Sequence, residues 1–245
     1  CVSAMDKAFT STFNNYDYIE DKVVLSPGSP CPILFGIRGD EPNVLPDAMR
    51  ALRGEKVDRW LVFESNQGTD DHLVPSKVAE VKPFSSATIR GVISSQPRTI
   101  PGGHVIASVR DATGEIDIAI YEPAKGFRDV LRALVPGDRV VACGGLREKP
   151  LTVNVEKLNV TWLVNVVRKV SNPRCNKCDK AMKSEGNGLG FRCERCSAKA
   201  PKGAGAFEAV KRSLAMGWYE PPACARRHLA KPLKRTDWKL GKMLA

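Results

Sequence analysis

The sequence contains no apolar run approaching the roughly 18 residues that a membrane-spanning helix needs, so it predicts no membrane protein. Its first residues, CVSAMDKAFTSTF, lack the basic-then-apolar order of a secretory signal. It also lacks a Walker-type phosphate loop and any nucleophile-triad signature, so these common catalytic motifs do not indicate which reaction, if any, the protein catalyses. No initiator Met precedes Cys1, and we expect the chain to be a fragment of a longer protein rather than a processed product.

The positive charge of the chain is confined to its C-terminal part. Residues 171–245 hold 17 Lys+Arg and 6 Asp+Glu, so the whole net charge of +11 lies there. A localised positive field attracts polyanions and makes their binding depend on salt. The segment therefore predicts binding to nucleic acid, with a solvated surface that only aids solubility as the alternative.

Four of the eight cysteines occur in paired spacing, Cys175-x2-Cys178 and Cys193-x2-Cys196, with 14 residues between the pairs. Each CxxC turn places two thiolates on one side of a metal ion, and two such turns complete a tetrahedron. Because protein fills all four positions, we expect a structural Zn²⁺ rather than a catalytic one. A redox pair and two disulfides are the alternatives. The scattered remaining cysteines fit a reducing cytoplasm, where paired cysteines usually bind metal.

Cations and one aromatic residue of the C-terminal part are the first RNA-binding candidates. In the cysteine segment, Arg192 and Arg195 are suited to contact phosphates, and Phe191 is suited to stack on a base. The alternative for Phe191 is packing under the metal. After a hinge at 200–206 and a short helix predicted over 207–217, the Pro-rich tail suggests an extended arm lying on a nucleic-acid backbone. Its candidates are Arg226, Arg227, His228 and Lys231.

Residues 87–163 alternate as three strands, one amphipathic helix and two further strands. The helix places Phe127, Val130, Leu131 and Leu134 inward. This order predicts an OB-fold barrel over 83–165, and an unrelated small barrel is the alternative. Because OB barrels commonly bind single strands, further RNA-binding candidates are Arg98 in the first loop and Lys125 and Arg128 at the helix start; each of these has an ordinary surface charge as its alternative.

The first 80 residues predict an incomplete α+β piece. Short strands are expected at Pro32–Phe35 and Trp60–Glu64, with a helix over 44–53. The polar motifs GIRG and SNQGTDDHL contain Arg38, Asn66, Gln67 and Asp70. A glycine-flanked Arg can meet a phosphate or carboxylate, and acidic groups can hold a cationic ligand or a metal. A polar turn is the alternative.

These residues together resemble the C-terminal part of the archaeal agmatidine (2-agmatinylcytidine) synthetase family, TiaS. The matching stretches extend from about Pro30 to Leu233: GIRG, ESNQGTDDHL, IRGVISSQPRTIPGGHVI, YEPAKGFRDVLRALVPGDRV, NPRCNKCDKAMKS with GFRCERC, and YEPPACARRHLAKPL. The resemblance implies a multidomain α+β chain. It would contain a partial ferredoxin-like piece at 1–80, an OB-fold at 83–165, a zinc ribbon at 171–200, and a short helix with a basic tail at 201–245.

The resemblance also implies a ligase that uses ATP and Mg²⁺ to join agmatine to C2 of the wobble cytidine of the AUA-decoding isoleucine tRNA. The family's aspartate-rich ATP motif is absent here, and Asp70 and Asp71 do not replace it. We therefore expect this chain to be the tRNA-binding part and to be inactive alone. The set Arg38, Asn66, Gln67 and Asp70 is expected to line the agmatine or nucleotide pocket. The rival hypothesis is a non-enzymatic single-strand-binding protein of OB-fold and zinc-ribbon type.

Overall fold

The computed structural model describes residues 1–186 and 188–243, which divide into two compact units. Unit 1 comprises Cys1–Leu163 with Leu214–Ala245, and unit 2 comprises Val164–Ser213. The chain therefore leaves unit 1, forms unit 2 and returns to unit 1. None of the described helices has the length and apolar composition to cross a membrane.

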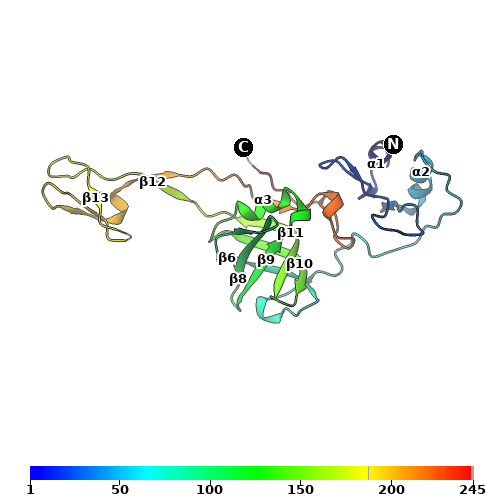
Figure 1. Ribbon diagram of the computed structural model, residues 1–245, viewed down its shortest axis with the longest axis horizontal. Coiled ribbons are helices and arrows are strands. Elements are labelled where there is room, and N and C mark those ends of the chain that lie inside the picture. The colour runs from blue at the N-terminus through cyan, green and yellow to red at the C-terminus, as the bar shows by residue number, and fades with distance from the viewer. Residues whose placement is uncertain (187, 244–245) are drawn as a thin grey trace. The chain divides into compact units, whose positions relative to one another are not determined.

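A closed five-stranded barrel forms the centre of unit 1 (Figure 1). Its strands are β6 (Ser86–Ile93), β8 (His104–Arg110), β9 (Glu115–Ile120), β10 (Arg139–Arg147) and β11 (Thr152–Trp162). They pair in the order β6-β10-β11-β9-β8, and a further β6–β8 pairing closes the ring. The 3₁₀ turn η3 (Glu122–Ala124) and helix α3 (Phe127–Arg132) connect β9 to β10. The OB-fold prediction is confirmed.

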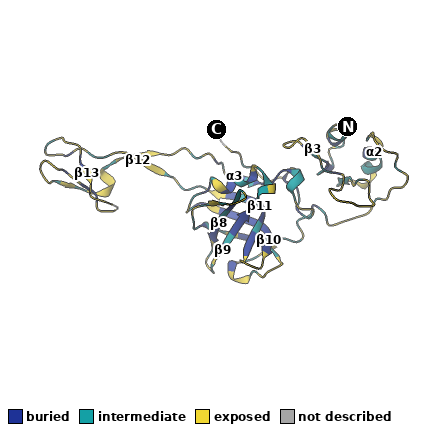
Figure 2. Ribbon diagram, in the orientation of Figure 1, coloured by how far each residue is buried: buried dark blue, intermediate teal, exposed yellow. Residues whose placement is uncertain are grey.

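Alternating apolar side chains fill the barrel because successive residues of a strand point to opposite faces. Ile89, Val105, Ile118 and Leu158 are fully buried in this core, and Figure 2 shows the barrel strands as the main buried region. The inward face of α3 packs against the same core. The four side chains predicted to point inward are all buried: Phe127, Val130, Leu131 and Leu134.

The C-terminal tail extends the barrel sheet. Strand β17 (Gly217–Tyr219) pairs antiparallel with β11 through Val160↔Gly217 and Leu158↔Tyr219. The short strands β5 (Val74–Pro75) and β7 (Arg98–Ile100) join the same sheet beside β6 and β8. The 3₁₀ turns η5 (Ala223–Ala225) and η6 (Leu233–Arg235) follow β17. The prediction of an extended tail is therefore wrong, because backbone pairing with β11 and burial of Tyr219 in the barrel core hold the start of the tail on unit 1.

Residues 1–80 form small paired segments. The elements are α1 (Val2–Ala8), β1 (Thr12–Phe13), β2 (Tyr16–Asp17), β3 (Lys22–Val23), β4 (Arg38–Gly39), η1 (Pro42–Val44), α2 (Leu45–Arg50) and η2 (Val78–Glu80). The predicted helix over 44–53 is confirmed in α2, and a small core gathers Met5, Leu25 and Ala48. The strands expected at 32–35 and 60–64 are not formed. Both segments are irregular and pair with no strand within the described residues, and Ile33, Leu61 and Phe63 stay exposed.

Unit 2 contains two small sheets. Strand β12 (Val167–Ser171) pairs antiparallel with β16 (Ala206–Ala209), so the outgoing and returning chains lie side by side. A three-stranded sheet follows, with β13 (Lys183–Ser184), β14 (Phe191–Arg192) and β15 (Lys199–Ala200), and η4 (Lys202–Ala204) leads back to β16. The helix predicted over 207–217 is wrong, because backbone pairing to β12 competes successfully with its helical pattern.

Candidate functional site

The four paired cysteines converge in unit 2 on two turns of the same design. In each turn the first cysteine's carbonyl accepts the N–H of the residue four positions later, Asp179 in one turn and Ser197 in the other. Both of these residues adopt positive φ, 53° and 59°, which reverses the chain after each pair. The N–H of the first cysteine donates to the carbonyl of the residue five positions later, which is Lys180 in one turn and Ala198 in the other. The repeated geometry brings all four thiols to one point.

The spacing of the sulfur atoms fits a tetrahedral zinc ion. The four Sγ atoms lie within 4.8 Å of one another. Cys175 and Cys196 are 3.4 Å apart at sulfur, Cys178 and Cys193 are 3.4 Å apart, and Cys178 and Cys196 are 3.8 Å apart. A tetrahedron with Zn–S arms of about 2.3 Å has edges of about 3.8 Å. A disulfide requires about 2.05 Å, so these sulfurs are free thiols, grouped closely enough to hold one metal ion.

Backbone N–H groups around the cluster favour thiolates. The N–H of Lys177 lowers the pKa of Cys175. The N–H groups of Cys196 and Arg195 outweigh desolvation and lower the pKa of Cys193 to about 6. At Cys196, the Ala198 N–H also favours the thiolate, but the Cys175 thiol and burial raise its pKa to about 11. A cation is what would allow all four to ionise together, which is the chemistry of a structural zinc site.

Phe191 lies beneath the cysteine cluster and is buried. Its ring is 3% exposed and packs with Met182, Cys175 and Cys193 in the small core of unit 2. The Lys169 ammonium lies 5.1 Å from the ring centre. The structure therefore supports packing rather than base stacking for Phe191, because a buried ring offers no face to a nucleobase.

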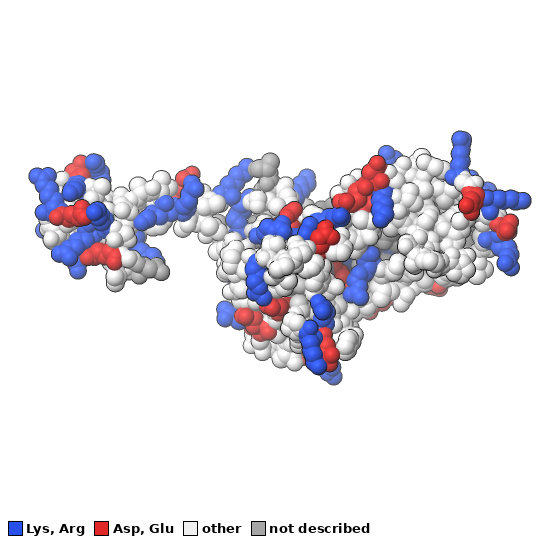
Figure 3. All heavy atoms as spheres, in the orientation of Figure 1, with Lys and Arg blue, Asp and Glu red and all other residues white. Residues whose placement is uncertain are grey.

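Exposed cations surround the cluster, and Figure 3 shows Lys and Arg over much of the visible face of unit 2. Arg195 is exposed. Arg192 lies 4.0 Å from Glu185, and Lys183 lies 2.5 Å from Glu194. Exposed ion pairs of this kind contribute little and exchange readily for other anions. Arg192 and Arg195 therefore remain available for phosphate contact.

The three candidates on the barrel differ in their availability. Arg98 is exposed and lies 3.5 Å from Asp117, and Lys125 is half-buried beside Glu122. Arg128 instead donates to the Gly103 carbonyl at 2.7 Å and to the Lys125 carbonyl at 3.0 Å. These bonds tie the start of α3 to the β7–β8 hairpin. The structure therefore favours a structural role for Arg128 and leaves Arg98 and Lys125 as surface cations.

Two motifs far apart in the sequence meet around Arg38. The Arg38 guanidinium bonds to the Gln67 side chain and lies 3.4 Å from Nδ1 of His228. The Gly68 N–H donates to the His228 carbonyl at 2.8 Å, which fixes the tail beside the SNQG turn. Burial lowers the pKa of Arg38. Asn66 is exposed, and only its backbone carbonyl, bonded to Thr69, enters this turn. The structure thus gathers Arg38, Gln67 and His228.

Asp70 does not join Arg38, Gln67 and His228, because it pairs with Lys157 instead. Its carboxylate forms an ion pair with Lys157, whose side chain is 1% exposed, and accepts the Lys231 backbone N–H at 2.7 Å. Both carboxylate oxygens are therefore occupied. The expectation that Asp70 binds agmatine conflicts with this geometry, because a second cation would have to displace a buried ammonium that has lost its water.

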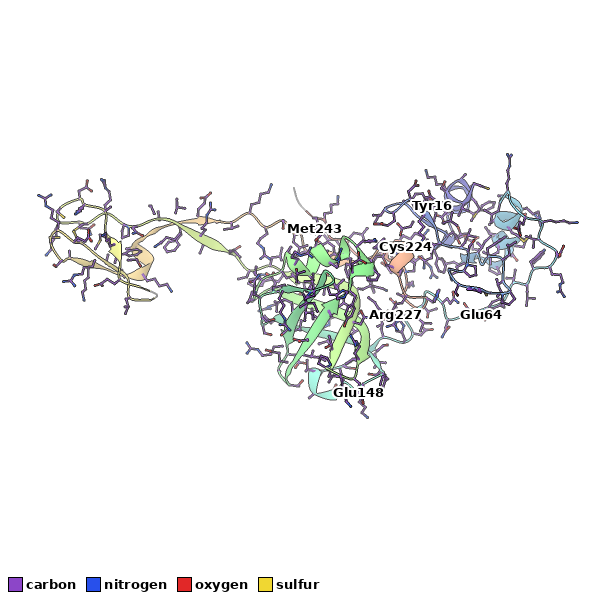
Figure 4. The ribbon with its side chains drawn as sticks, in the orientation of Figure 1. Tyr16, Glu64, Glu148, Cys224, Arg227 and Met243 are labelled. Carbon is purple, nitrogen blue, oxygen red and sulfur yellow. The ribbon has the colours of Figure 1, made fainter. Side chains whose placement is uncertain are left out.

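A second buried charge lies next to Lys157 on β11. Glu156 is 2% exposed at its side chain, accepts a bond from His72 Nε2 at 2.9 Å and pairs with Arg227 at 2.9 Å. Arg227, labelled in Figure 4, is about half-exposed and reaches this carboxylate from the tail. The sequence analysis missed this junction, although adjacent charges in the apolar strand TVNVEKLNV were a usable signal.

The tail also fastens residues 1–80. Arg226 is largely buried, where it pairs with Glu220 at 2.7 Å and bonds to Asn14. Desolvation lowers the pKa of Arg226 and raises that of Glu220. Arg235 pairs with Asp40 and lies 4.0 Å over the Phe13 ring, and the Cys224 N–H donates to Asp17. Arg226 is therefore a structural link, which disfavours its predicted contact with RNA.

Three stretches of the chain match known domain families. Residues 1–72 match the TiaS FLD domain, residues 87–161 match an OB-fold nucleic acid binding domain, and residues 172–214 match the TiaS C-terminal zinc ribbon domain. The ribbon match extends beyond the predicted end at residue 200 and includes β16, whereas its partner strand β12 lies just before the matched residues.

The chain is also similar to named proteins and solved structures over nearly its whole length. It is 41% identical over 237 residues to the isoleucine-tRNA 2-agmatinylcytidine synthetase TiaS of Methanocaldococcus jannaschii, covering 96% of the chain and 56% of that protein. It matches the structure of a complex of TiaS with its isoleucine tRNA and ATP with a TM-score of 0.81, at 38% identity over 96% of the chain and 55% of that structure. A complex of TiaS with the same tRNA, AMPCPP and agmatine gives 0.80, at 36% identity over 96% and 54%. The chain spans about half the length of the curated relatives it matches.

Proposed function

We propose, on the premise that this chain carries the FLD and C-terminal zinc ribbon domains of the TiaS family on either side of an OB-fold, that it is the tRNA-holding part of an isoleucine-tRNA 2-agmatinylcytidine synthetase. The complete enzyme would be a cytoplasmic ligase that uses ATP and Mg²⁺ to join agmatine to C2 of the wobble cytidine. Its tRNA would then decode AUA. The similarity over 96% of the chain to structures of TiaS with its isoleucine tRNA carries this proposal.

The physical demands of the reaction fit this division of labour. A single cytidine must leave the anticodon stack before its base can react. The rest of the tRNA must be held in register meanwhile, and phosphate contacts position a nucleic acid while base contacts specify it. The barrel supplies the exposed Arg98 and the partly exposed Lys125, and unit 2 supplies Arg192 and Arg195. These groups are suited to holding the tRNA rather than to the chemistry.

In this proposal zinc has a structural role. Unit 2 has a core of only a few buried residues, Cys175, Met182, Phe191 and Cys193, so burial alone provides little folding energy. Four thiolates around Zn²⁺ would supply that energy and leave no open position for water or substrate. The metal would hold the cationic surface in place without taking part in the reaction.

The Arg38 group suits an anion better than agmatine. Agmatine is a dication, so the Arg38 guanidinium repels it, and Asp70 is already paired with Lys157. Arg38 with Gln67 and His228 instead offers donors to a phosphate group of the tRNA or the nucleotide. We retain Arg38 and Gln67 as candidates for the nucleotide side of the site, and the exposed Asn66 is not part of this group.

A binding comparison on the full chain tests the proposal. Fluorescence anisotropy would compare the AUA-decoding isoleucine tRNA, a different folded tRNA and an unstructured RNA of equal length at several salt concentrations. We expect the tightest binding to the isoleucine tRNA and a linear fall of log K with log salt. Equal affinity for all three RNAs would instead support the rival function, a single-strand-binding protein that the OB-fold and the ribbon would also serve.

A further inference from the structure

A groove at the end of the barrel has no role in the site described above. It encloses about 530 Å³, within the range of about 300–1,000 Å³ that is usual for small-ligand sites. Three separate segments of unit 1 line it: the end of β11, the residues before β17 and the last part of the tail. The lining residues are Trp162, Leu163, Ala215, Met216, Lys239, Leu240 and Lys242.

Backbone pairing of the tail builds this groove. The Ala215 N–H donates to the Lys242 carbonyl at 2.9 Å, and the Trp218 N–H donates to the Lys239 carbonyl at 2.8 Å. The Tyr219 hydroxyl donates to the Ala215 carbonyl at 2.7 Å and lies 3.1 Å from the Lys242 carbonyl. Met243, labelled in Figure 4, bridges to Leu214 on the same path. Both lysines are therefore held beside the end of β11 by an ordered backbone.

The side chains of the groove combine an open aromatic surface with positive charge. Trp162 is 45% exposed, Met216 is 47% exposed and Leu240 is 53% exposed. Arg139 lies with its guanidinium carbon 5.5 Å from the centre of the Trp162 ring. Lys239 and Lys242 are exposed, and no carboxylate is among the described residues that line the groove. The described lining therefore combines an exposed indole with cations and no acidic side chain, and exposed apolar surface rimmed by polar groups marks an interaction site.

We propose that this groove binds one unpaired nucleotide of the RNA, with its base on Trp162 and its phosphates at Lys239 and Lys242. Stacking on an aromatic ring beside a positively charged track is how proteins hold single-stranded nucleotides without reading their sequence. Apolar Met216 and Leu240 would cover the edges of the base, and Arg139 adds a third cation. The inference rests on the proposed function, since it names the contact through which the barrel and tail would hold tRNA.

Substitution of the aromatic residue tests the stacking. Affinity of the full chain for the isoleucine tRNA would be measured by anisotropy for Trp162→Leu, for Trp162→Phe and for the control Trp60→Leu, which removes another exposed tryptophan. We expect Trp162→Leu to weaken binding roughly tenfold. Trp162→Phe retains a ring and should recover most of that loss, whereas Trp60→Leu should bind as the parent chain does. An unchanged affinity for Trp162→Leu would overturn the inference.

Removal of the two lysines tests the phosphate contacts independently of the tryptophan. The double variant Lys239→Ala/Lys242→Ala should reduce the slope of log K against log salt by about 1.4 to 1.8, since each phosphate contact contributes about 0.7 to 0.9. The control Lys22→Ala/Lys56→Ala removes the same charge from exposed positions elsewhere and should leave the slope unchanged. Equal slopes for the two double variants would contradict the inference.

The same measurements separate the two proposals. If the chain prefers the isoleucine tRNA but its affinity does not change when Trp162 or the lysine pair is substituted, the proposed function stands and the groove is not its tRNA-binding site. Equal binding to every RNA, with the loss at Trp162→Leu still present on an unstructured RNA, would retain the groove as a nucleotide site and overturn the tRNA-specific function.

Discussion

Lys157 is one of the least exposed side chains of unit 1, although it carries a charge. It extends from β11 to the Asp70 carboxylate and lies 5.6 Å from the centre of the Trp238 ring. Glu156 beside it is equally buried and pairs with His72 and Arg227. Buried charges are tolerated only where their partners are fixed. These two residues therefore fix the SNQGTDDH segment and the tail against one strand of the barrel.

Removing one member of this pair should be costly. We expect Asp70→Ala to lower the free energy of unfolding by about 3 kcal/mol or more, because it leaves the Lys157 ammonium buried and unpaired. Urea unfolding followed by fluorescence measures the difference. The neighbouring exposed residue provides the control, and Asp71→Ala should change stability by less than about 0.5 kcal/mol.

A combined substitution distinguishes a structural pair from a ligand site. Asp70→Leu with Lys157→Met replaces both charges by apolar groups and should recover much of the lost stability. A single variant Asp70→Ala as stable as the parent chain would show that the carboxylate is free, and would restore it as a candidate for binding agmatine.

The sequence predicts a residue's role well when its partners are local. The four cysteines are spaced by turns of a few residues, so their convergence follows from the spacing alone. Asp70 and Lys157 are 87 residues apart, and Cys224 and Asp17 are 207 apart. No local sequence pattern reveals such distant pairings. For this reason the sequence suggests that Asp70 binds a ligand and that Arg226 contacts RNA, whereas both are paired within the protein.

At the scale of elements, the turn between β8 and β9 depends on one carboxylate. Asp111 accepts N–H bonds from Val78, Thr113 and Gly114. Desolvation opposes its ionisation, but these bonds and the Thr113 hydroxyl outweigh it and lower its pKa to about 2. The turn and η2 are therefore held by the ionised form.

This lowered pKa predicts how stability varies with acid. Since the folded pKa lies below the unfolded value of 3.8, the contribution of Asp111 is fully present above about pH 4 and is lost as the pH falls to about 2. We expect Asp111→Asn to be less stable than the parent chain at pH 7, with the difference shrinking towards pH 2. Urea unfolding of the two proteins from pH 2 to pH 7 measures the free-energy difference at each pH. A difference that does not vary with pH would contradict the assignment.

We expect the folding of unit 2 to depend on a bound metal ion. Titration of the thiols with a mercurial should release one zinc ion per chain, because four thiolates complete one tetrahedral site. Amide hydrogen exchange in β13, β14 and β15 should then accelerate, while exchange in the barrel stays slow. Cys193→Ser should reproduce the effect, and Cys31→Ser, at an exposed cysteine outside the cluster, should not. Release of no zinc would favour a redox pair.

Elements were predictable where periodicity and burial agree. The barrel strands and α3 alternate or repeat cleanly because each has one face in a common core. Residues 207–217 carry a helical pattern, yet β16 pairs with β12 about 40 residues earlier, and the backbone pairing prevails. Residues 60–64 have the composition of a strand without a neighbour to pair with, so composition alone misled the prediction.

At the scale of the whole chain, unit 2 is an insertion between two segments that lie together in unit 1. The chain leaves after Leu163 and returns at Leu214, close to where Val160 pairs with Gly217. Within unit 2, Arg212 donates to the Val164 carbonyl at 3.0 Å, so both ends of the insertion are joined at its base.

Deletion of residues 164–213, with a short Gly/Ser linker in their place, should therefore leave the barrel folded. We expect the melting temperature of the remaining chain to change by less than about 5 °C, because the strand pairs of the barrel and β17 stay intact. Differential scanning calorimetry measures this. Loss of the cooperative transition would show that unit 2 is required for the fold of unit 1.

The way β12 and β16 run together has a consequence for damage and repair. If a structural Zn²⁺ is bound and then lost, we expect the loops beyond Ser171 to open while the β12–β16 pairing still holds the two ends of the insertion in register. Loss of the metal would then stay confined to unit 2, and added zinc would restore the ribbon without refolding the barrel.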